Sequence, residues 1–289
     1  MRNTLAVAPS MSAANTSPLK MVDAAAAPRT GLTELIRIQN VSKTYTTASG
    51  DAVHAVDNVD LSITDGEFVC IVGPSGCGKS TLLRMLAGLD TYDDGSLTLN
   101  GMEVAGPSGD VGVVFQAANL LPWITVRENV ALPLRVGGRR ESAEQRITDL
   151  LAIAGLKDFG DRYPYELSGG MQQRAGICRA LARDPRILLM DEPFGALDAL
   201  TRERMNAELQ RIWQANAKTV VLITHSISEA IFLADRVVVM SARPGRVLRE
   251  IEIPIPRPRT FDSIVSHPEY ARLAREIRAL LNEQESTHE

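Results

Sequence analysis

Short apolar segments alternate with amphipathic ones over most of the chain. Runs with β-strand character occupy residues 35–41, 59–63 and 68–72, and the third, FVCIV, is apolar throughout, as expected of a strand buried on both faces. Later segments continue the pattern: an apolar strand at 187–191, a helix at about 199–215, an apolar strand at 219–224, a helix near 227–234 and a strand at 236–240. Strands that alternate with helices predict an α/β fold with a mainly parallel sheet covered by helices.

A more helical region separates the two groups of strands, from about residue 117 to 185. Ser142 and Gln145 form a capping-box pattern ahead of an apolar helical face that begins at Ile147. The pattern predicts a helical subdomain inserted into a domain of residues 32–253.

The two ends of the chain differ from this domain. Residues 1–31 are rich in Ala, Ser, Thr and Pro, and they are predicted to be a disordered leader. A signal peptide is the alternative, although the apolar piece Leu5–Ala8 is shorter than its hydrophobic region must be. Residues 254–289 are predicted to be a proline-rich connector, IPIPRPR, followed by one amphipathic helix from His267 to Gln284. This segment either packs on the domain or serves regulation.

Composition narrows the class of protein. The 45% hydrophobic content of the 289 residues is ordinary for a globular protein, and the net charge of −4 argues against a broad basic surface for nucleic acid. Cys70, Cys77 and Cys178 lack the spacing of a metal or redox pair, so a reducing compartment is expected. No apolar run approaches the ~20 residues of a membrane-spanning helix. Contact with a membrane is therefore predicted to be peripheral.

A phosphate-binding loop follows directly after the strand at 68–72. The motif GPSGCGKST consists of Gly73, Pro74, Ser75, Gly76, Cys77, Gly78, Lys79, Ser80 and Thr81. Its glycines let backbone N–H groups point at phosphate oxygens, and the next helix adds its positive end. Lys79 is expected to reach the β- and γ-phosphates, Ser80 to bind Mg²⁺ and Thr81 to contact phosphate. A chance glycine-rich turn is the alternative, and the loop alone would suit a kinase, a GTPase or a helicase equally well.

Two adjacent acids end the strand ILLMD. Asp191 and Glu192 lie at the carboxyl end of this strand, where parallel sheets place their ligands. Asp191 is expected to hold Mg²⁺ through its water shell, and Glu192 to polarise the attacking water. The alternative is a solvated acidic pair at a strand end.

The sequence LSGGMQQR at 167–174 distinguishes among these nucleotide-binding families. It resembles the signature of the ABC ATPases, and the resemblance covers nearly all of residues 35–250. Ser168, Gly169 and Gly170 begin a helix, so a hydroxyl and bare N–H groups can form an anion site. An ordinary helix cap would leave the spacing of the motifs unexplained.

The resemblance implies a fold, cofactors and a partner. The fold is that of a P-loop NTPase, with a RecA-like, mainly parallel sheet core, an N-terminal antiparallel β subdomain and the inserted helical subdomain. The cofactors are ATP and Mg²⁺. A second copy of the subunit is implied as well, because in this family residues 168–170 meet the γ-phosphate held by the partner.

Four further positions match the family. Gln116 would contact Mg²⁺ and the attacking water, and His225 resembles the switch histidine that contacts the γ-phosphate. Asp198 resembles the loop that links the two sites of a dimer. Tyr45 resembles the aromatic residue that stacks on adenine, although a strand aromatic packed into the core would look the same. Each of the others, taken alone, could be an ordinary polar residue at a strand end or turn.

Two stretches indicate the kind of ABC protein. NLLPWITVRENV at 119–130 and MSARPGRV at 240–247 resemble the bacterial importers for nitrate, sulfonates and taurine. The resemblance implies an ATPase on the cytoplasmic face of the inner membrane, with integral membrane permease subunits and, indirectly, a periplasmic or lipid-anchored solute-binding protein as partners, and no nucleic acid. Leu121, Pro122 and Trp123 could receive a short permease helix, or Trp123 could pack the helical subdomain against the sheet.

Other functions remain to be distinguished. A non-transport ABC ATPase would have a soluble or nucleic-acid partner and would not copurify with integral membrane proteins. A phosphate-loop kinase would have no use for LSGGMQQR. The solute is left open among nitrate, taurine and alkanesulfonates.

Overall fold

The computed structural model describes residues 33–136, 143–195, 197–216 and 218–285. The predicted leader and Ser142 of the predicted capping box lie outside these residues. No helix in the described part of the chain is long and apolar enough to cross a bilayer.

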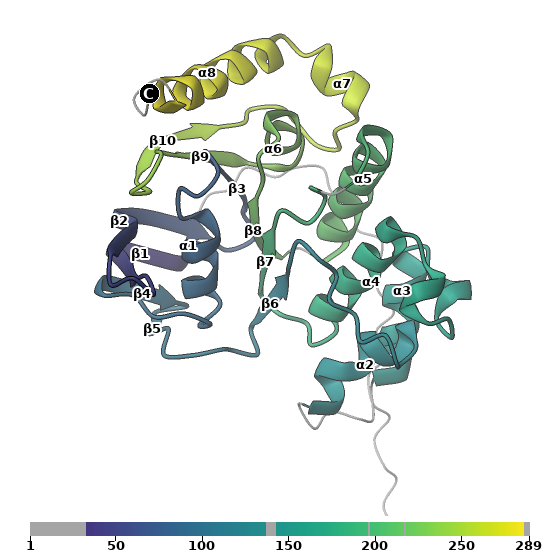
Figure 1. Cartoon of the computed structure of the whole chain (residues 1–289). Coiled ribbons are helices and arrows are strands. Elements are labelled where there is room, and N and C mark those ends of the chain that lie inside the picture. The colour runs from purple at the N-terminus through teal and green to yellow at the C-terminus, as the bar shows by residue number, and fades with distance from the viewer. Residues whose placement is uncertain (1–32, 137–142, 196, 217, 286–289) are drawn as a thin grey trace, which may run out of the picture.

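A six-stranded sheet forms the centre of the molecule, in the order β10-β9-β3-β8-β7-β6 (Figure 1). Its strands are β3 Phe68–Val72, β6 Val111–Val114, β7 Ile187–Asp191, β8 Thr219–Ile223, β9 Arg236–Met240 and β10 Val247–Glu252. All neighbours are parallel except β10 and β9. The predicted mainly parallel sheet is therefore present, and β10 is an antiparallel edge strand that the apolar pattern did not predict.

Side chains of the central strand alternate between two cores. Phe68, Cys70 and Val72 of β3 pack into one core, and Val69 and Ile71 pack into the other. This alternation is why FVCIV is apolar throughout, since neither face of the strand reaches water.

A four-stranded antiparallel sheet, in the order β2-β1-β4-β5, packs over one face through α1. Its strands are β1 Glu34–Thr46, β2 Ala52–Thr64, β4 Asp94–Leu99 and β5 Met102–Glu103, and the helix is α1 Lys79–Leu86. Leu82, Leu83, Met85 and Leu86 of α1 are almost fully buried. Because α1 begins at the end of the phosphate motif, this packing fixes the direction in which the loop faces.

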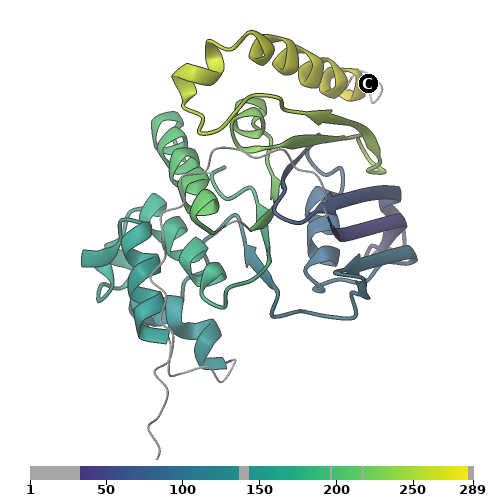
Figure 2. The same ribbon diagram turned by 180° about the vertical axis from the view of Figure 1, so that it is seen from behind.

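The region between β6 and β7 is helical and lies to one side of the sheets (Figures 1 and 2). It contains α2 Val126–Val136, α3 Ala143–Ile153, the 3₁₀ turns η1 Lys157–Phe159 and η2 Pro164–Glu166, and α4 Gly169–Leu181. Its apolar side chains, such as Val130, Ile147 and Ile177, join the larger core.

The remaining helices are α5 Ala199–Asn216, α6 Ile227–Leu233, α7 Phe261–Val265 and α8 Pro268–Glu285. The predicted C-terminal helix is α8, which lies across α6 and β9 (Figure 2). Leu273 and Ile277 of α8, with Ile253 and Ile255 of the connector, are buried in the larger core. Of the two roles considered for residues 254–289, the described part therefore packs on the domain.

Candidate functional site

The phosphate motif forms a tight loop between β3 and α1. Gly78 caps α1 with a φ of 97°, and a Cβ built on it would lie 2.4 Å from the Ala55 carbonyl oxygen, so glycine is required there. Lys79 is 6% exposed, and its ammonium donates to the carbonyls of Gly73 and Pro74, both at 2.8 Å. The loop thus surrounds a buried cation and places the start of a helix beside it, which is an arrangement suited to polyphosphate.

The structure brings Ser80 of the phosphate motif together with Asp191 at the end of β7. The Ser80 hydroxyl donates to Asp191 Oδ1 at 3.0 Å. Burial raises the pKa of the Asp191 carboxyl, and the Glu192 carboxylate adds to this while the bond from Ser80 opposes it. A bound cation would favour the ionised carboxylate and so offset the cost of its burial.

The donors at this point fit Mg²⁺. A hydroxyl and one carboxylate are hard oxygen ligands, and Mg²⁺ in nucleotide sites takes one or two protein oxygens with the rest from phosphate and water. No cluster of three or more His, Cys, Asp or Glu side chains suited to a metal occurs among the described residues. The fit is therefore to a cation held jointly with a nucleotide.

Glu192 and His225 form a second pair beside the first. The Glu192 Oε2 atom lies 3.4 Å from His225 Nδ1, and the Glu192 N–H donates to the Ile223 carbonyl at 3.0 Å. Glu192 has a φ of 43°, which is unusual for a residue with a long side chain and is held by the adjoining strands. The turn separates the two acids, so Asp191 meets Ser80 and Glu192 meets His225.

Residues 168–170 lie at the exposed start of α4. Ser168 caps the helix by accepting from the Met171 N–H at 3.4 Å, which leaves the N–H groups of Gly169 and Gly170 free to bind an anion. Among the described residues, no hydrogen bond joins this helix start to the phosphate loop of the same chain. The structure does not assemble all the predicted nucleotide contacts within one chain.

Gln116 is exposed in the loop after β6, and α4 holds that loop. Gln173 of α4 donates to the Phe115 carbonyl at 3.1 Å. Arg179, two turns further along α4, donates to the Ala118 and Asn119 carbonyls, both at 2.7 Å. The sequence interpretation missed Gln173 and Arg179. The only signal for Gln173 was a polar residue on the inward face of a helix, where it is 4% exposed.

Two other predicted residues have local partners. Asp198 caps α5 by accepting from the Thr201 N–H at 3.0 Å, and hydrogen bonding by the Thr201 side chain, with this N–H, lowers the pKa of its carboxyl. The Tyr45 hydroxyl donates to Asp90 Oδ2 at 2.6 Å, and burial raises the pKa of this phenol, as does the bond to Asp90. The Tyr45 ring packs partly against the core, and the rest of the side chain is exposed to solvent.

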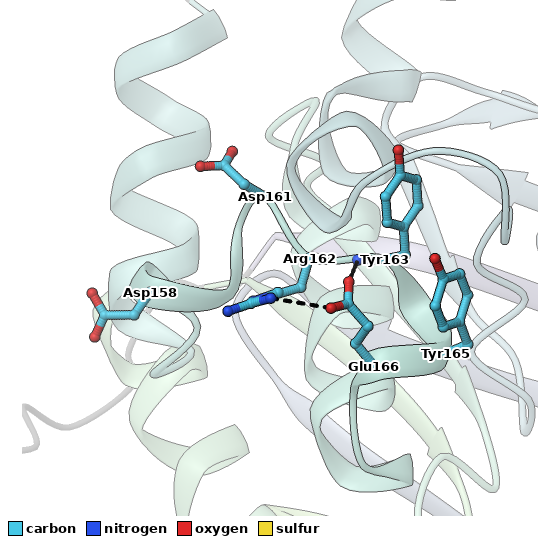
Figure 3. Close-up of a pocket in the computed structure, with 6 residues that line it drawn as sticks. All are labelled: Asp158, Asp161, Arg162, Tyr163, Tyr165 and Glu166. Atoms are coloured by element: carbon cyan, nitrogen blue, oxygen red, sulfur yellow. Dashed lines mark hydrogen bonds and ion pairs between the residues drawn. The ribbon is translucent and has the colours of Figure 1, made fainter.

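An aromatic surface lies on the helical side of the molecule. Trp123 is 70% exposed, so it does not pack the helical region against the sheet. The neighbouring segment carries Tyr163 and Tyr165, whose rings stack with centroids 5.6 Å apart. The segments adjoin, because the Val126 N–H donates to the Arg162 carbonyl at 2.8 Å. A hollow of about 560 Å³ opens beside the tyrosines (Figure 3) and is lined by Asp158, Asp161, Arg162, Tyr163, Tyr165 and Glu166.

Comparison with known proteins identifies this arrangement. The ABC transporter family matches residues 56–195. The chain is 49% identical over 256 residues to the taurine import ATP-binding protein TauB of Rhizobium johnstonii, covering 87% of this chain and 98% of that one. The chain belongs to the ABC transporter ATP-binding proteins.

Other relatives carry different solute names. The nitrate import ATP-binding protein NrtD of Synechocystis sp. is 44% identical over 258 residues, which is 87% of this chain and 96% of that one. The bicarbonate transport ATP-binding protein CmpC of Synechococcus elongatus is 43% identical over 253 residues, covering 86% of this chain and 38% of that one.

The fold agrees with this family. A solved ATP-binding cassette, dimeric in a post-hydrolysis state and bound to ADP and Pi, superposes with a TM-score of 0.66 at 36% identity, covering 77% of this chain and all of that one. The predicted P-loop NTPase fold, with a mainly parallel core, an antiparallel sheet and a helical region, is confirmed. The chain is an ABC ATPase.

Proposed function

We propose that this ABC ATPase works as a homodimer that hydrolyses ATP to drive import of a small anion through a separate permease. One observation carries the proposal: two regions of the chain suited to bind phosphate do not share a hydrogen bond among the described residues. Asp191, Glu192 and His225 adjoin Ser80 of the phosphate loop, and the start of α4, with its free N–H groups, faces solvent elsewhere.

Each residue near the loop has a role that its position supports. Backbone N–H groups and Lys79 bind the β- and γ-phosphates, and Thr81 adds a phosphate contact. Ser80 and Asp191, with Gln116, would hold Mg²⁺, which supplies positive charge to the phosphate oxygens. Glu192 accepts a proton from the attacking water, and His225, 3.4 Å from it, faces the γ-phosphate.

The second copy completes the site. Ser168, Gly169 and Gly170 of one protomer would bind the γ-phosphate held by the other, and Asp198 would lie where the two sites communicate. ATP then joins the two copies, and loss of the γ-phosphate removes the anion that both hold. The dimeric state of the solved cassette bound to ADP and Pi supports this arrangement.

The aromatic surface supports a membrane partner. Trp123, Tyr163 and Tyr165 present an exposed apolar area beside the loop of Gln116. The adjoining hollow is lined by the carboxylates of Asp158, Asp161 and Glu166 and by Arg162, whose guanidinium pairs with Glu166 at 3.2 Å, so its lining keeps an acidic excess (Figure 3). We infer that a short cytoplasmic helix of the permease, with an apolar face and a basic residue, binds here, which places the ATPase peripherally on the inner face of the membrane.

The class of solute follows from the relatives. Proteins named for taurine, nitrate and bicarbonate resemble this chain to similar degrees. Solute choice therefore belongs to the permease and to the solute-binding protein, and nitrate, taurine or an alkanesulfonate all suit the proposal. The second candidate, a non-transport ABC ATPase, predicts salt-sensitive retention on nucleic acid instead of copurification with integral membrane proteins.

Substitution of Glu192 by Gln tests the catalytic assignment. The amide keeps the shape of the side chain and cannot take the proton, so turnover should fall by about 100-fold or more. ATP should still join two copies, and size-exclusion chromatography with MgATP should show a dimer that persists longer than that of the wild type. An active Glu192→Gln variant, or one that remains monomeric with ATP, would contradict the proposal.

A further inference from the structure

The loop between β9 and β10, residues 241–246, presses against the phosphate loop. Gly245 is buried there, and a Cβ built on it would lie 1.9 Å from the Cys77 carbonyl oxygen. On the other side of the motif, a Cβ on Gly73 would lie 3.0 Å from the Met240 carbonyl oxygen. The end of β9 and the loop that follows it therefore contact both the beginning and the later part of the phosphate loop.

The 241–246 loop is itself held rigidly. Ser241 and Arg246 exchange backbone and side-chain bonds: the Ser241 N–H donates to the Arg246 carbonyl and the Arg246 N–H to the Ser241 hydroxyl oxygen, both at 2.9 Å. The Gly245 N–H donates to the Ala55 carbonyl and the Asp57 N–H to the Gly245 carbonyl, both at 3.0 Å. Arg246 Nε also donates to Asp57 Oδ2 at 3.1 Å. The loop is thus fixed to β2, on the same carbonyl against which Gly78 packs.

From this fixed position Arg243 reaches the apex of the phosphate loop. Its Nε atom donates to the Gly76 carbonyl at 3.2 Å. A trans peptide group points its carbonyl and its N–H in opposite directions. On the other side of this peptide group the Cys77 N–H donates to the Pro74 carbonyl, with 3.4 Å between nitrogen and oxygen, and Lys79 donates to the same carbonyl.

We propose that Arg243 is a positioning residue for nucleotide binding, which holds the Gly76–Cys77 peptide group in the turn that encloses the Lys79 ammonium. Gly76 has a φ of 74° and no side chain to restrict it, so the orientation of this peptide group rests on hydrogen bonds. The bond from the Cys77 N–H to Pro74 is long, and Arg243 supports the group at the Gly76 carbonyl. Arg243 does so from a loop more than 160 residues away in the sequence, and it acts through the backbone, not on the reacting atoms. The inference rests on the ATPase function proposed above.

The test compares Arg243→Ala with Arg249→Ala, which removes the same charge from an exposed residue of the same hairpin. We expect Arg243→Ala to raise the KM for ATP, and the dissociation constant of a fluorescent ATP analogue, by about three- to tenfold with kcat within about twofold. Arg243→Gln, which retains a neutral donor, should restore part of the affinity, and Arg249→Ala should behave as the wild type.

Each outcome bears on one proposal. If the wild type neither binds nor hydrolyses ATP, the proposed function fails. If the wild type is active and Arg243→Ala matches Arg249→Ala, the positioning role is refuted. Attraction by charge alone would also refute it. In that case Arg243→Lys would restore the affinity, Arg243→Gln would not, and 0.5 M salt, at which the Debye length is about 4 Å, would abolish the difference from the wild type.

Discussion

Arg259 anchors the C-terminal segment, and its removal should destabilise the protein strongly. The residue is 3% exposed, and its guanidinium donates to five backbone carbonyls, those of Ile231, Phe232, Ala234, Ile253 and Ile255. Three of them belong to the end of α6, where a helix leaves its carbonyls without partners. Burial lowers the pKa of Arg259 to about 9, with a further lowering by the charge of Arg257, so the side chain keeps its proton at neutral pH.

The magnitude follows from the carbonyls that lose their donor. Arg259→Met keeps most of the side-chain volume and removes every N–H of the guanidinium. A buried acceptor left without a donor costs about 1–3 kcal/mol. The net loss for five carbonyls is smaller than five times this cost, because some of the carbonyls shift toward water. Release of a buried cation offsets a further part. We expect a net loss of about 3–5 kcal/mol in the free energy of unfolding.

Trp213 provides the assay. Its indole N–H donates to the Lys218 carbonyl, and the Arg257 guanidinium lies 4.5 Å from its ring centroid, so its emission reports on the packing of the connector. In a Trp123→Phe background it is the one remaining tryptophan, since the sequence has two. Urea unfolding followed by fluorescence and by circular dichroism gives the stability.

Two further variants make this measurement decisive. Arg278→Met, on the exposed face of α8, is the matched control and should stay within about 0.5 kcal/mol of the wild type. Arg259→Lys should be intermediate, because an ammonium group has three donors for five carbonyls. An Arg259→Met protein as stable as the Arg278→Met protein would refute the reasoning.

Two other variants test the site and its surroundings. Lys79→Ala should weaken binding of a fluorescent ATP analogue by about tenfold or more, because a charge-assisted contact to phosphate is lost, and normal affinity would overturn the assignment. Glu229 has a carboxyl whose pKa is raised by burial, so the folded state binds its proton more tightly than the unfolded state. Stability of the wild type relative to Glu229→Gln should therefore fall as the pH rises above the ordinary glutamate pKa of about 4.3 and through the raised value. Urea unfolding at several pH values checks this, and a constant or rising difference would contradict it.

The parts of the site that share a local motif could be predicted from the sequence. The phosphate loop needs glycines at fixed positions between a buried strand and a helix, and Asp191 and Glu192 follow an apolar strand, so neighbouring residues suffice to identify them. That Ser80 would meet Asp191 also follows, because the carboxyl ends of parallel strands lie at one edge of the sheet.

Contacts between distant segments could not be predicted in this way. Arg259 lies in a proline-rich stretch and would ordinarily be solvated, and only the arrival of the end of α6 makes it buried. Arg243 likewise meets Gly76 only because β9 lies beside β3. Strands β4 and β10 were missed because DGSLTL and VLREIE are short and carry several polar residues, and in β10 this suits an edge position that keeps one side in water.

Two separate sets of contacts connect the nucleotide site to the rest of the molecule. Gln173 and Arg179 bind the loop of Gln116 to α4, the helix whose first residues would meet the partner's ATP. His225 immediately precedes α6, whose last carbonyls are held by Arg259. Because α4 carries both its own exposed end and the Gln116 loop, the proposed contact with a second copy would act on both, whereas His225 is joined to Glu192 and, through α6, to the C-terminal segment. Gln116 and Glu192, between which the proposed attacking water would lie, therefore belong to two different sets of contacts.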